Sequence, residues 1–284
     1  MLPKSFRSFV PLSVKEFLYS LKERRASVIP LEGFKLAVHQ HDIIISESIR
    51  QSRVWAQAET RLFRELITPG MVVIDVGANI GYFSLLASML VGPGGQVHAF
   101  EPDPVNFGLL KKNVRINHAS NIKVVQTALS NNDDPVPLFL NSDNKGDHRM
   151  WEATGESRTK ITVKATTLDR YLNKTGIVPA FIKIDVQGAE GQVLAGMKET
   201  LARATPLYMI LELWPEALRQ CGTDPLHMVQ MIAEAGFTIR VVADDLLLGK
   251  NVIVEQTFSS ANAQALVDLA DAAPYRQIDL ICAR

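Results

Sequence analysis

Short apolar runs alternate along most of the chain with stretches in which apolar residues recur at helical spacing. The runs are rich in Val and Ile and are bounded by Gly, Pro or polar residues, which is typical of strands covered on both faces. Seven of them are expected as core strands, at residues 71–76, 96–101, 123–127, 181–186, 207–213, 237–242 and 278–282. Strands that alternate with helices predict an α/β fold with a parallel sheet.

The residues before this alternation predict a cap on the sheet. Val14, Phe17, Leu18 and Leu21 share one face of a locally basic helix that starts near Ser13. Two short strands are expected at 34–38 and 42–45, and a helical stripe, Trp55, Leu62, Phe63, Leu66 and Ile67, follows them. We expect the basic helix to pack on its own domain or on a second copy, as in a homodimer, in preference to a membrane surface. The prediction is a cap over 1–68 and a ligand-binding domain over 69–284.

A glycine turn after the first core strand predicts the ligand site. Gly77 and Gly81 can adopt backbone angles closed to other residues, and the helix that follows directs unpaired N–H groups into the same crevice. Glu101 ends the next strand 20 positions after Gly81, where a carboxylate is placed to bind ribose hydroxyls. The spacing is not G-x-G-x-x-G, and Asp75 beside the turn suits a ligand with a positive end.

Three segments, IDVGANIGYF, AFEPDP and KIDVQGAE, occur in this order. Together they resemble the FkbM-type methyltransferases that use S-adenosylmethionine, over roughly residues 33–281. The resemblance implies a class I, Rossmann-like fold with a doubly wound, mostly parallel seven-stranded sheet and an antiparallel last strand. It also implies O-methylation of a hydroxyl on a small-molecule, sugar, polyketide-type or lipid-linked acceptor, with S-adenosylhomocysteine as product.

The same resemblance assigns the cofactor-binding positions. The glycine turn holds the methionine portion, Glu101 with the adjoining Pro102 binds the ribose, and small residues after the third core strand flank the adenine. The residues expected to bind the cofactor are Asp75, Gly77, Ala78, Asn79, Gly81, Glu101, Pro102, Thr127 and Ala128.

Methyl transfer to a hydroxyl also needs a group that takes the hydroxyl proton. The polar stretch between predicted strands at 135–140 and 161–165 is long, and long loops in compact domains are often functional. It contains His148, whose ordinary pKa suits a base near neutral pH, and Gly146, a candidate hinge. Asp185 and Glu212 lie at strand ends that face the crevice, so His148, Asp185 and Glu212 are the catalytic candidates. We expect the neighbouring Arg149 and Trp151 to bind the acceptor.

One position departs from the family pattern Lys-Ile-Asp-Val-Glu-Gly-Ala-Glu. Gln187 stands where the first Glu is usual, which removes one carboxylate beside Asp185. Asp185, Glu190 and Glu212 still supply oxygen ligands that a hard cation such as Mg²⁺ prefers. A required metal is therefore not expected, but the residues leave it open.

Composition narrows the classes of partner. Lys plus Arg and Asp plus Glu both total 30 of 284 residues, so no net field favours nucleic acid. The two cysteines, Cys221 and Cys282, indicate no disulfide framework, and no transmembrane or secretory segment is recognised, so a cytoplasmic location is expected. Two alternatives stay open: a nucleotide-dependent oxidoreductase, which shares the strand–glycine–helix–acid layout, and a non-catalytic methyltransferase-like scaffold.

Overall fold

The computed structural model of the protein describes residues 26–153, 155–203, 206–242, 256–273 and 275–284. The basic helix expected from Ser13 lies outside the described residues.

Within these residues, the core is a seven-stranded sheet with the order β12-β13-β11-β10-β3-β4-β5. Its strands are β3 (Val72–Val76), β4 (Gln96–Phe100), β5 (Ile122–Val125), β10 (Phe181–Ile184), β11 (Tyr208–Leu213), β12 (Thr238–Val242) and β13 (Ile278–Ala283). The pairs from β5 to β11 are parallel, whereas β13 lies between β11 and β12 and is antiparallel to both. The predicted mostly parallel sheet with an antiparallel last strand is confirmed.

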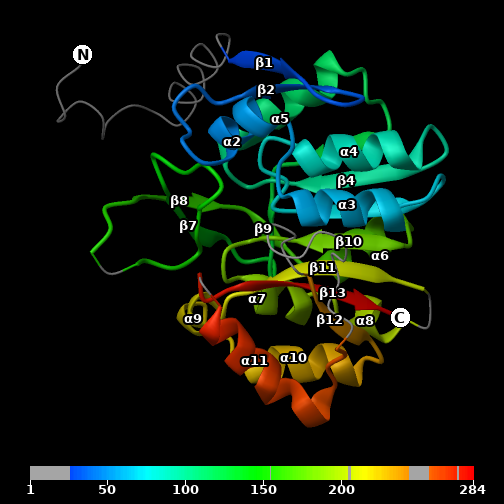
Figure 1. Ribbon diagram of the computed structural model, residues 1–284, viewed down its shortest axis with the longest axis vertical. Helices are drawn as coiled ribbons and strands as arrows, with labels where there is room; N and C mark the ends of the chain where they lie inside the picture. The colour runs from blue at the N-terminus through cyan, green and yellow to red at the C-terminus, as the bar shows by residue number, and fades with distance from the viewer. Residues whose placement is uncertain (1–25, 154, 204–205, 243–255, 274) are drawn as a thin grey trace.

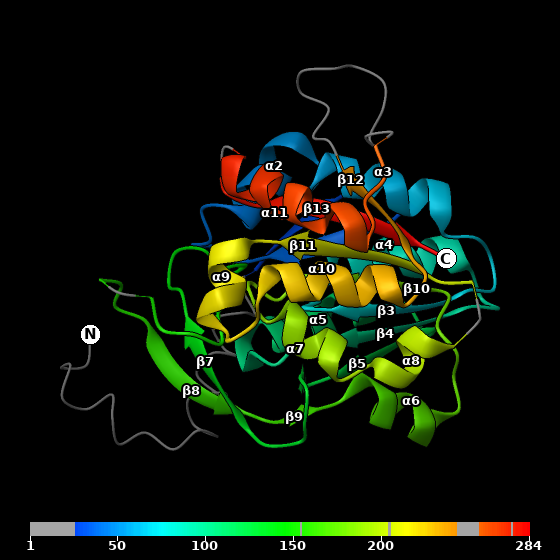
Figure 2. The same cartoon turned by 90° about the horizontal axis from the view of Figure 1, so that it is seen from below.

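Helices cover both faces of the sheet because side chains alternate along its strands. Val73 belongs to the apolar cluster on one face, where a first group of elements packs. The next residue, Ile74, belongs to the apolar cluster on the other face, where a second group packs. The first group is β1 (Ser27–Pro30), β2 (Lys35–Val38), α2 (Ile45–Ser52), α3 (Gln57–Leu66), α4 (Tyr82–Val91) and α5 (Pro104–Ile116). The second is α6 (Leu168–Thr175), α7 (Glu190–Ala195), α8 (Lys198–Ala202), α9 (Pro215–Gln220), α10 (Pro225–Glu234), the 3₁₀ turn η2 (Ser260–Asn262) and α11 (Ala263–Ala272). Figure 2 looks onto this second layer.

One cap element differs from the prediction. Residues 42–45, expected as a strand, form a turn and the start of α2 instead. The Asp42 carboxylate accepts the backbone N–H of Ser46 at 2.7 Å, which satisfies a donor of the first helical turn. This local hydrogen bond outweighs the strand preference of the three isoleucines after Asp42. The division into 1–68 and 69–284 stays a prediction, since the cap and α4–α5 share one apolar cluster.

A small arm projects at the edge of the sheet where the parallel strands end (Figure 1). It is the antiparallel hairpin of β7 (Val136–Leu140) and β8 (Thr159–Val163), attached through the short parallel pair β6 (Ala128–Leu129) and β9 (Ala165–Thr166). The polar stretch 141–158 connects β7 to β8. The arm therefore stands beside the crevice at the carboxyl ends of the strands, where ligands bind in open α/β sheets.

Candidate active site

The glycine turn joins β3 to α4 and is fixed by its neighbours. The N–H groups of Gly77 and Ala78 both donate to the carbonyl of Phe100, at 3.0 and 2.9 Å. Gly77 has φ +80°, and a Cβ there would lie 2.0 Å from the carbonyl oxygen of Asp185. Glycine is thus required at this position because the turn presses against the end of β10.

Gly81, the second glycine of the turn, has a packing role in the structure. A Cβ on Gly81 would lie 2.5 Å from Leu110 of α5, and Gly81 lines neither of the two cavities described below. Its φ of +92° and the close packing of α4 on α5 explain the glycine. Direct contact with a ligand stays a prediction that this packing does not support.

Glu101, at the end of β4, is buried and faces the turn. One carboxylate oxygen accepts the N–H of Asn79 and the other accepts the N–H of Asp103, both at 2.8 Å. Burial, and then the charge of Asp103, raise the pKa of Glu101 to about 8. A buried carboxyl with a raised pKa is a good acceptor for further hydroxyl donors, which would stabilise its ionised form.

Two cavities meet at the carboxyl ends of β3 and β10. The smaller one joins the buried carboxyl of Glu101 to apolar walls from Phe100, Leu129 and Leu138. Four further predicted residues line this cavity and not the larger one: Pro102, Thr127, Ala128 and His148. An apolar slot with one buried carboxyl at its side suits a nucleoside, with the base between the walls and the ribose at the acid.

The larger cavity has a volume of about 560 Å³ and adjoins the smaller one. Five residues line both, namely Gly77, Asn79, Gly146, Asp185 and Gln187. The predicted residues Asp75, Ala78 and Glu212 line the larger cavity only. Its wall combines apolar side chains from α2 and the segment before α3, including Ile44, Val54 and Trp55, with carboxyl groups from the sheet.

A buried lysine connects the carboxylates of this cavity. Lys183 occupies the position on β10 that pairs in register with Asp75 on β3, and its ammonium donates to Asp185 at 2.8 Å. Burial would lower the pKa of Lys183, but Asp185, Asp75 and Glu59 outweigh it and raise that pKa. Asp75 accepts the hydroxyl of Ser84 at 2.5 Å, and burial raises the pKa of Asp75 against the opposing effect of Lys183.

Asp185 and Glu212 lie together but differ in acidity. Burial acts to raise the pKa of Asp185, yet the charge of Lys183 and the hydrogen bonds from Lys183 and Gln187 hold it below its usual value. The pKa of Glu212 is raised well above its usual value by burial and by Asp185, Glu190 and Asp279. Asp185 therefore ionises at lower pH than Glu212, and two neighbouring carboxyls of unlike acidity are suited to proton transfer.

Glu190 accepts hydrogen bonds from the turn after β10 and lines neither of the two cavities. Its two oxygens accept the N–H groups of Val186 and Gly188, each at 2.9 Å, and burial raises its pKa to about 7. Across the described part of the chain, no group of three or more His, Cys, Asp and Glu side chains is arranged to hold a metal ion.

His148 lies at the smaller of the two cavities. Its Nδ1 atom accepts the N–H of Asn141 at 3.1 Å, and its Nε2 atom lies 3.7 Å from a carboxylate oxygen of Asp103. His148 does not line the larger cavity, so the structure does not bring it together with Asp185 and Glu212. The stretch that connects β7 to β8 contacts α2 where Gly146 packs against Ile45. In the same stretch, the Lys145 carbonyl accepts hydrogen bonds from the side-chain amides of Asn79 and Asn106.

Arg149 and Trp151 lie outside both cavities. The Arg149 guanidinium sits between two indoles, with 4.7 Å to the ring centre of Trp151 and 4.9 Å to that of Trp214. It also pairs with the carboxylate of Asp147, and the indole N–H of Trp151 donates to the carbonyl of Gln187 at 3.2 Å. Trp151 therefore connects the arm to the turn after β10, and Arg149 connects it to Trp214 after β11.

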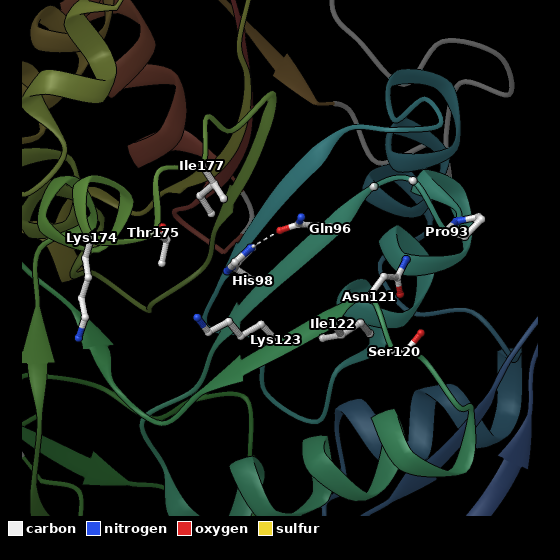
Figure 3. A pocket seen from close by; sticks show the side chains of 12 residues that line it. Pro93, Gln96, His98, Ser120, Asn121, Ile122, Lys123, Lys174, Thr175 and Ile177 are labelled. Atoms are coloured by element: carbon white, nitrogen blue, oxygen red, sulfur yellow. Dashed lines mark hydrogen bonds between the residues drawn. The ribbon is translucent and has the colours of Figure 1, made fainter.

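A further cavity of about 690 Å³ opens at the opposite edge of the sheet, at the amino ends of β4 and β5 (Figure 3). His98, Lys123 and Lys174 line it, and His98 lies 3.3 Å from the side-chain oxygen of Gln96. This edge is remote from the glycine turn, and none of the predicted site residues lines this cavity.

Sequence reasoning missed two residues of the site. Lys183 carries a detectable signal, because a lysine inside the apolar run 181–184 must find a partner when buried. Asp103 begins α5 by accepting the N–H of Asn106 at 2.8 Å, and its carboxylate is buried. Its importance depends on the approach of His148 from a distant loop, which no local pattern reveals.

The chain is similar to known proteins over more than half of its length. Residues 75–239 match the model of the methyltransferase FkbM domain. The 31-O-demethyl-FK506 methyltransferase FkbM of Streptomyces tacrolimicus is 30% identical over 240 residues, covering 67% of this chain and 86% of that protein.

Two other relatives are more distant. The 2-O-methyltransferase NoeI of Sinorhizobium fredii is 26% identical, covering 62% of this chain and 78% of its own length. The hexuronic acid methyltransferase AglP of Haloferax volcanii is 27% identical, covering 67% and 74%. Among the described helices, none has the length and apolar character needed to cross a membrane.

Proposed function

We propose that this chain, which belongs to the FkbM methyltransferase family, transfers the methyl group of S-adenosylmethionine to a hydroxyl oxygen of a small acceptor. Membership of the family favours a methyltransferase over the nucleotide-dependent oxidoreductase. The observation that carries the proposal is the meeting of two cavities at Asp185, one with the buried carboxyl of Glu101 and the other with a pair of carboxyls of unlike acidity.

The described residues fit the cofactor at both ends. Glu101 is buried in an otherwise apolar slot and retains acceptor capacity for ribose hydroxyls. At the other end, Asp75, Ala78 and Asn79 line the larger cavity, where a carboxyl group suits the positive amino end of the methionine portion. Bound S-adenosylmethionine supplies an electrophilic methyl group on a sulfonium.

The chain's own part in the reaction is to orient the acceptor and take its proton. The new bond forms between the hydroxyl oxygen and the methyl carbon, the bond from carbon to sulfur breaks, and the hydroxyl proton passes to a carboxylate. Asp185 is the proposed proton acceptor, because it lines both cavities and is ionised near neutral pH. Glu212 is the proposed donor of a hydrogen bond to the acceptor. Holding the reactants in line supplies much of the acceleration.

The assignment of His148 as base stays a prediction, with less support than Asp185 has. So does the binding of the acceptor by Arg149 and Trp151, since both side chains are already engaged. The names of two relatives specify an oxygen position and that of a third specifies a hexuronic acid, which supports a sugar or other polyhydroxylated acceptor. The mixture of apolar and carboxyl groups in the larger cavity agrees with this class.

Ligand-induced stabilisation and methyl transfer test the proposal together. S-adenosylhomocysteine should raise the unfolding temperature of the protein, whereas NAD should not, because only a bound ligand stabilises the folded state. Incubation with methyl-labelled S-adenosylmethionine and a panel of glycosides and macrolides should then label a hydroxyl, and Asp185→Asn should abolish the labelling. Stabilisation by NAD alone would reject the proposal. Labelling of a nitrogen or carbon would reject the hydroxyl acceptor.

A further inference from the structure

Gln187 lies between the carboxyl groups of Asp185 and Glu212 and has an unusual backbone conformation. Its φ of +54° lies in the left-handed region, which a residue with a side chain seldom adopts. From there its amide nitrogen lies 3.0 Å from an oxygen of Asp185 and 3.4 Å from an oxygen of Glu212. A strained backbone that brings one amide to two carboxyls is the kind of feature that functional sites retain.

The amide is chemically suited to this place. An amide NH₂ group has two protons to donate and does not ionise, so it can serve two carboxyl groups at once. The titratable and charged groups that act on this pair come from four elements: Lys183 on β10, Asp75 on β3, Glu190 on α7 and Asp279 on β13. Glu59 on α3 acts on Lys183. Among these, the cation of Lys183 bonds Asp185. The amide of Gln187 is the donor that connects Asp185 to Glu212.

The backbone of Gln187 is tied to the arm. Its carbonyl accepts the indole N–H of Trp151 at 3.2 Å, and Trp151 meets Trp214 edge to face, with ring centres 6.3 Å apart. The Arg149 guanidinium lies against both rings. A cation against aromatic faces stabilises such an arrangement. The arm therefore holds the carbonyl of the residue whose side chain reaches the two carboxyls.

We infer that Gln187 is a positioning residue, whose amide fixes Asp185 and Glu212 toward the larger cavity while Trp151 of the arm fixes the backbone that carries this amide. The inference rests on the proposed function of Asp185 and Glu212. In this inference the arm helps to position Asp185, the proposed proton acceptor. The sequence had instead suggested that Arg149 and Trp151 of the arm contact the molecule to be methylated. Gln187 itself does not exchange a proton.

A titration of the two carboxyls tests this inference without an acceptor. Carbon-detected NMR of the complex with S-adenosylhomocysteine should show Asp185 titrating at lower pH than Glu212 in the unaltered protein. In Gln187→Met the midpoint of Asp185 should rise by about one pH unit, since its ionised form loses a hydrogen bond. Gln187→Glu, which keeps the shape, should raise it further because it adds a like charge. An unchanged midpoint in either variant would overturn the inference.

A matched pair of tryptophan variants tests the connection to the arm. Trp151→Phe removes the donor to the Gln187 carbonyl, and Trp214→Phe removes the other indole from the same side chain, Arg149. The Asp185 midpoint should rise in Trp151→Phe and stay in place in Trp214→Phe. Equal shifts in the two variants would remove the arm from the inference.

Turnover separates this inference from the proposed function. With an acceptor found, Gln187→Met should lower kcat about 10- to 100-fold while the affinity for S-adenosylhomocysteine is unchanged. A normal kcat would overturn the inference. If the unaltered protein methylates no hydroxyl, the proposed function fails, and the NMR titration still decides whether Gln187 positions the two carboxyls.

Discussion

The Nδ1 atom of His148 accepts a hydrogen bond from the backbone N–H of Asn141 at 3.1 Å. A neutral imidazole has one nitrogen lone pair available as an acceptor, and this contact uses it. The other nitrogen then carries a proton and faces the carboxylate of Asp103 at 3.7 Å. His148 is thereby arranged to hold the connecting stretch of the arm against the start of α5.

The first prediction compares His148 with Asp185. Loss of a general base lowers turnover by about 10²- to 10⁴-fold. Asp185→Asn should show such a loss, with little change in donor affinity, whereas His148→Ala should lower turnover by much less. Single-turnover methyl transfer, with calorimetric titration of S-adenosylhomocysteine in parallel, measures both. The reverse order of effects would return the role of base to His148.

The second prediction concerns Glu101 and pH. Its pKa of about 8 falls when ribose hydroxyls donate to the ionised form. Affinity for S-adenosylhomocysteine should therefore rise with pH up to about 8 and then level off. Glu101→Ala should weaken binding by about 1.5–3 kcal/mol, and Glu101→Gln should remove the pH dependence. Calorimetry across this pH range is the measurement, and a slope retained in Glu101→Gln would assign the effect to another group.

The same residue affects stability in the unliganded protein. A pKa raised from 4.5 to about 8 means that the folded state favours the protonated carboxyl. The resulting stabilisation is complete below pH 4.5, declines above it and is lost once the pH passes about 8. Glu101→Gln cannot ionise, so its unfolding free energy should exceed that of the unaltered protein most clearly above pH 8. Urea titrations at several pH values would detect the difference.

The third prediction concerns the buried cation. Lys183 is 3% exposed and faces two carboxyl groups. Lys183→Met should lower the unfolding free energy by about 3–5 kcal/mol, because the carboxylates lose their buried partner. The pKa of Asp185 should also rise. Lys198→Met, at an exposed position on α8, is the matched control and should change stability little. Equal losses in both variants would contradict a special role for Lys183.

The fourth prediction is a gain of cation binding. Gln187→Glu would add a third carboxyl beside Asp185 and Glu212, and hard cations bind such sets of oxygen ligands. Mg²⁺ or Ca²⁺ should then raise the unfolding temperature of Gln187→Glu by more than that of the unaltered protein. Gln187→Met serves as the control. No difference among the three proteins would show that the carboxyls do not converge.

The fifth prediction separates steric clash from backbone strain. Gly70 and Gly77 have φ values of +87° and +80°, but a Cβ on Gly70 would meet nothing within 4 Å. Gly70→Ala should therefore cost about 1–2 kcal/mol of stability from its left-handed backbone alone. Gly77→Ala adds a contact with the Asp185 carbonyl and should cost at least about 3 kcal/mol. Chemical denaturation measures the unfolding free energy of both variants. Equal costs would mean that the end of β10 shifts away from the added methyl group and relieves the contact.

Local patterns predicted the fold and several residues that line the two cavities. Most of the core strands are short apolar runs with glycine or proline near their ends, so their positions depend on nearby residues only. Glu101 was identified for the same reason, because a charge at the end of an apolar strand has a fixed direction. The family resemblance supplied the antiparallel β13, which spacing alone does not indicate.

The tasks of Arg149 and Trp151 could not be predicted in this way. Their partners Trp214 and Gln187 are 65 and 36 positions away from them along the chain. A polar loop rich in such residues resembles an acceptor site as long as its long-range contacts are unknown. At Asp42 the contact that the prediction missed is local. The Asp42 carboxylate accepts the N–H of Ser46, but the run of three isoleucines between these residues favours a strand and so misled the prediction.

The position of β13 between β11 and β12 has a consequence for biosynthesis. Among the described strands, β12 pairs within the sheet with β13 alone, and Asp279 of β13 pairs in register with Glu212. Residues 278–283 are translated after every other strand of the sheet, so a ribosome-bound chain lacking them can form the parallel strands but not the complete carboxyl cluster. Since non-local pairings form late and slowly, the carboxyl groups of Glu212 and Asp279 should reach their final arrangement last, after the residues that line the smaller cavity.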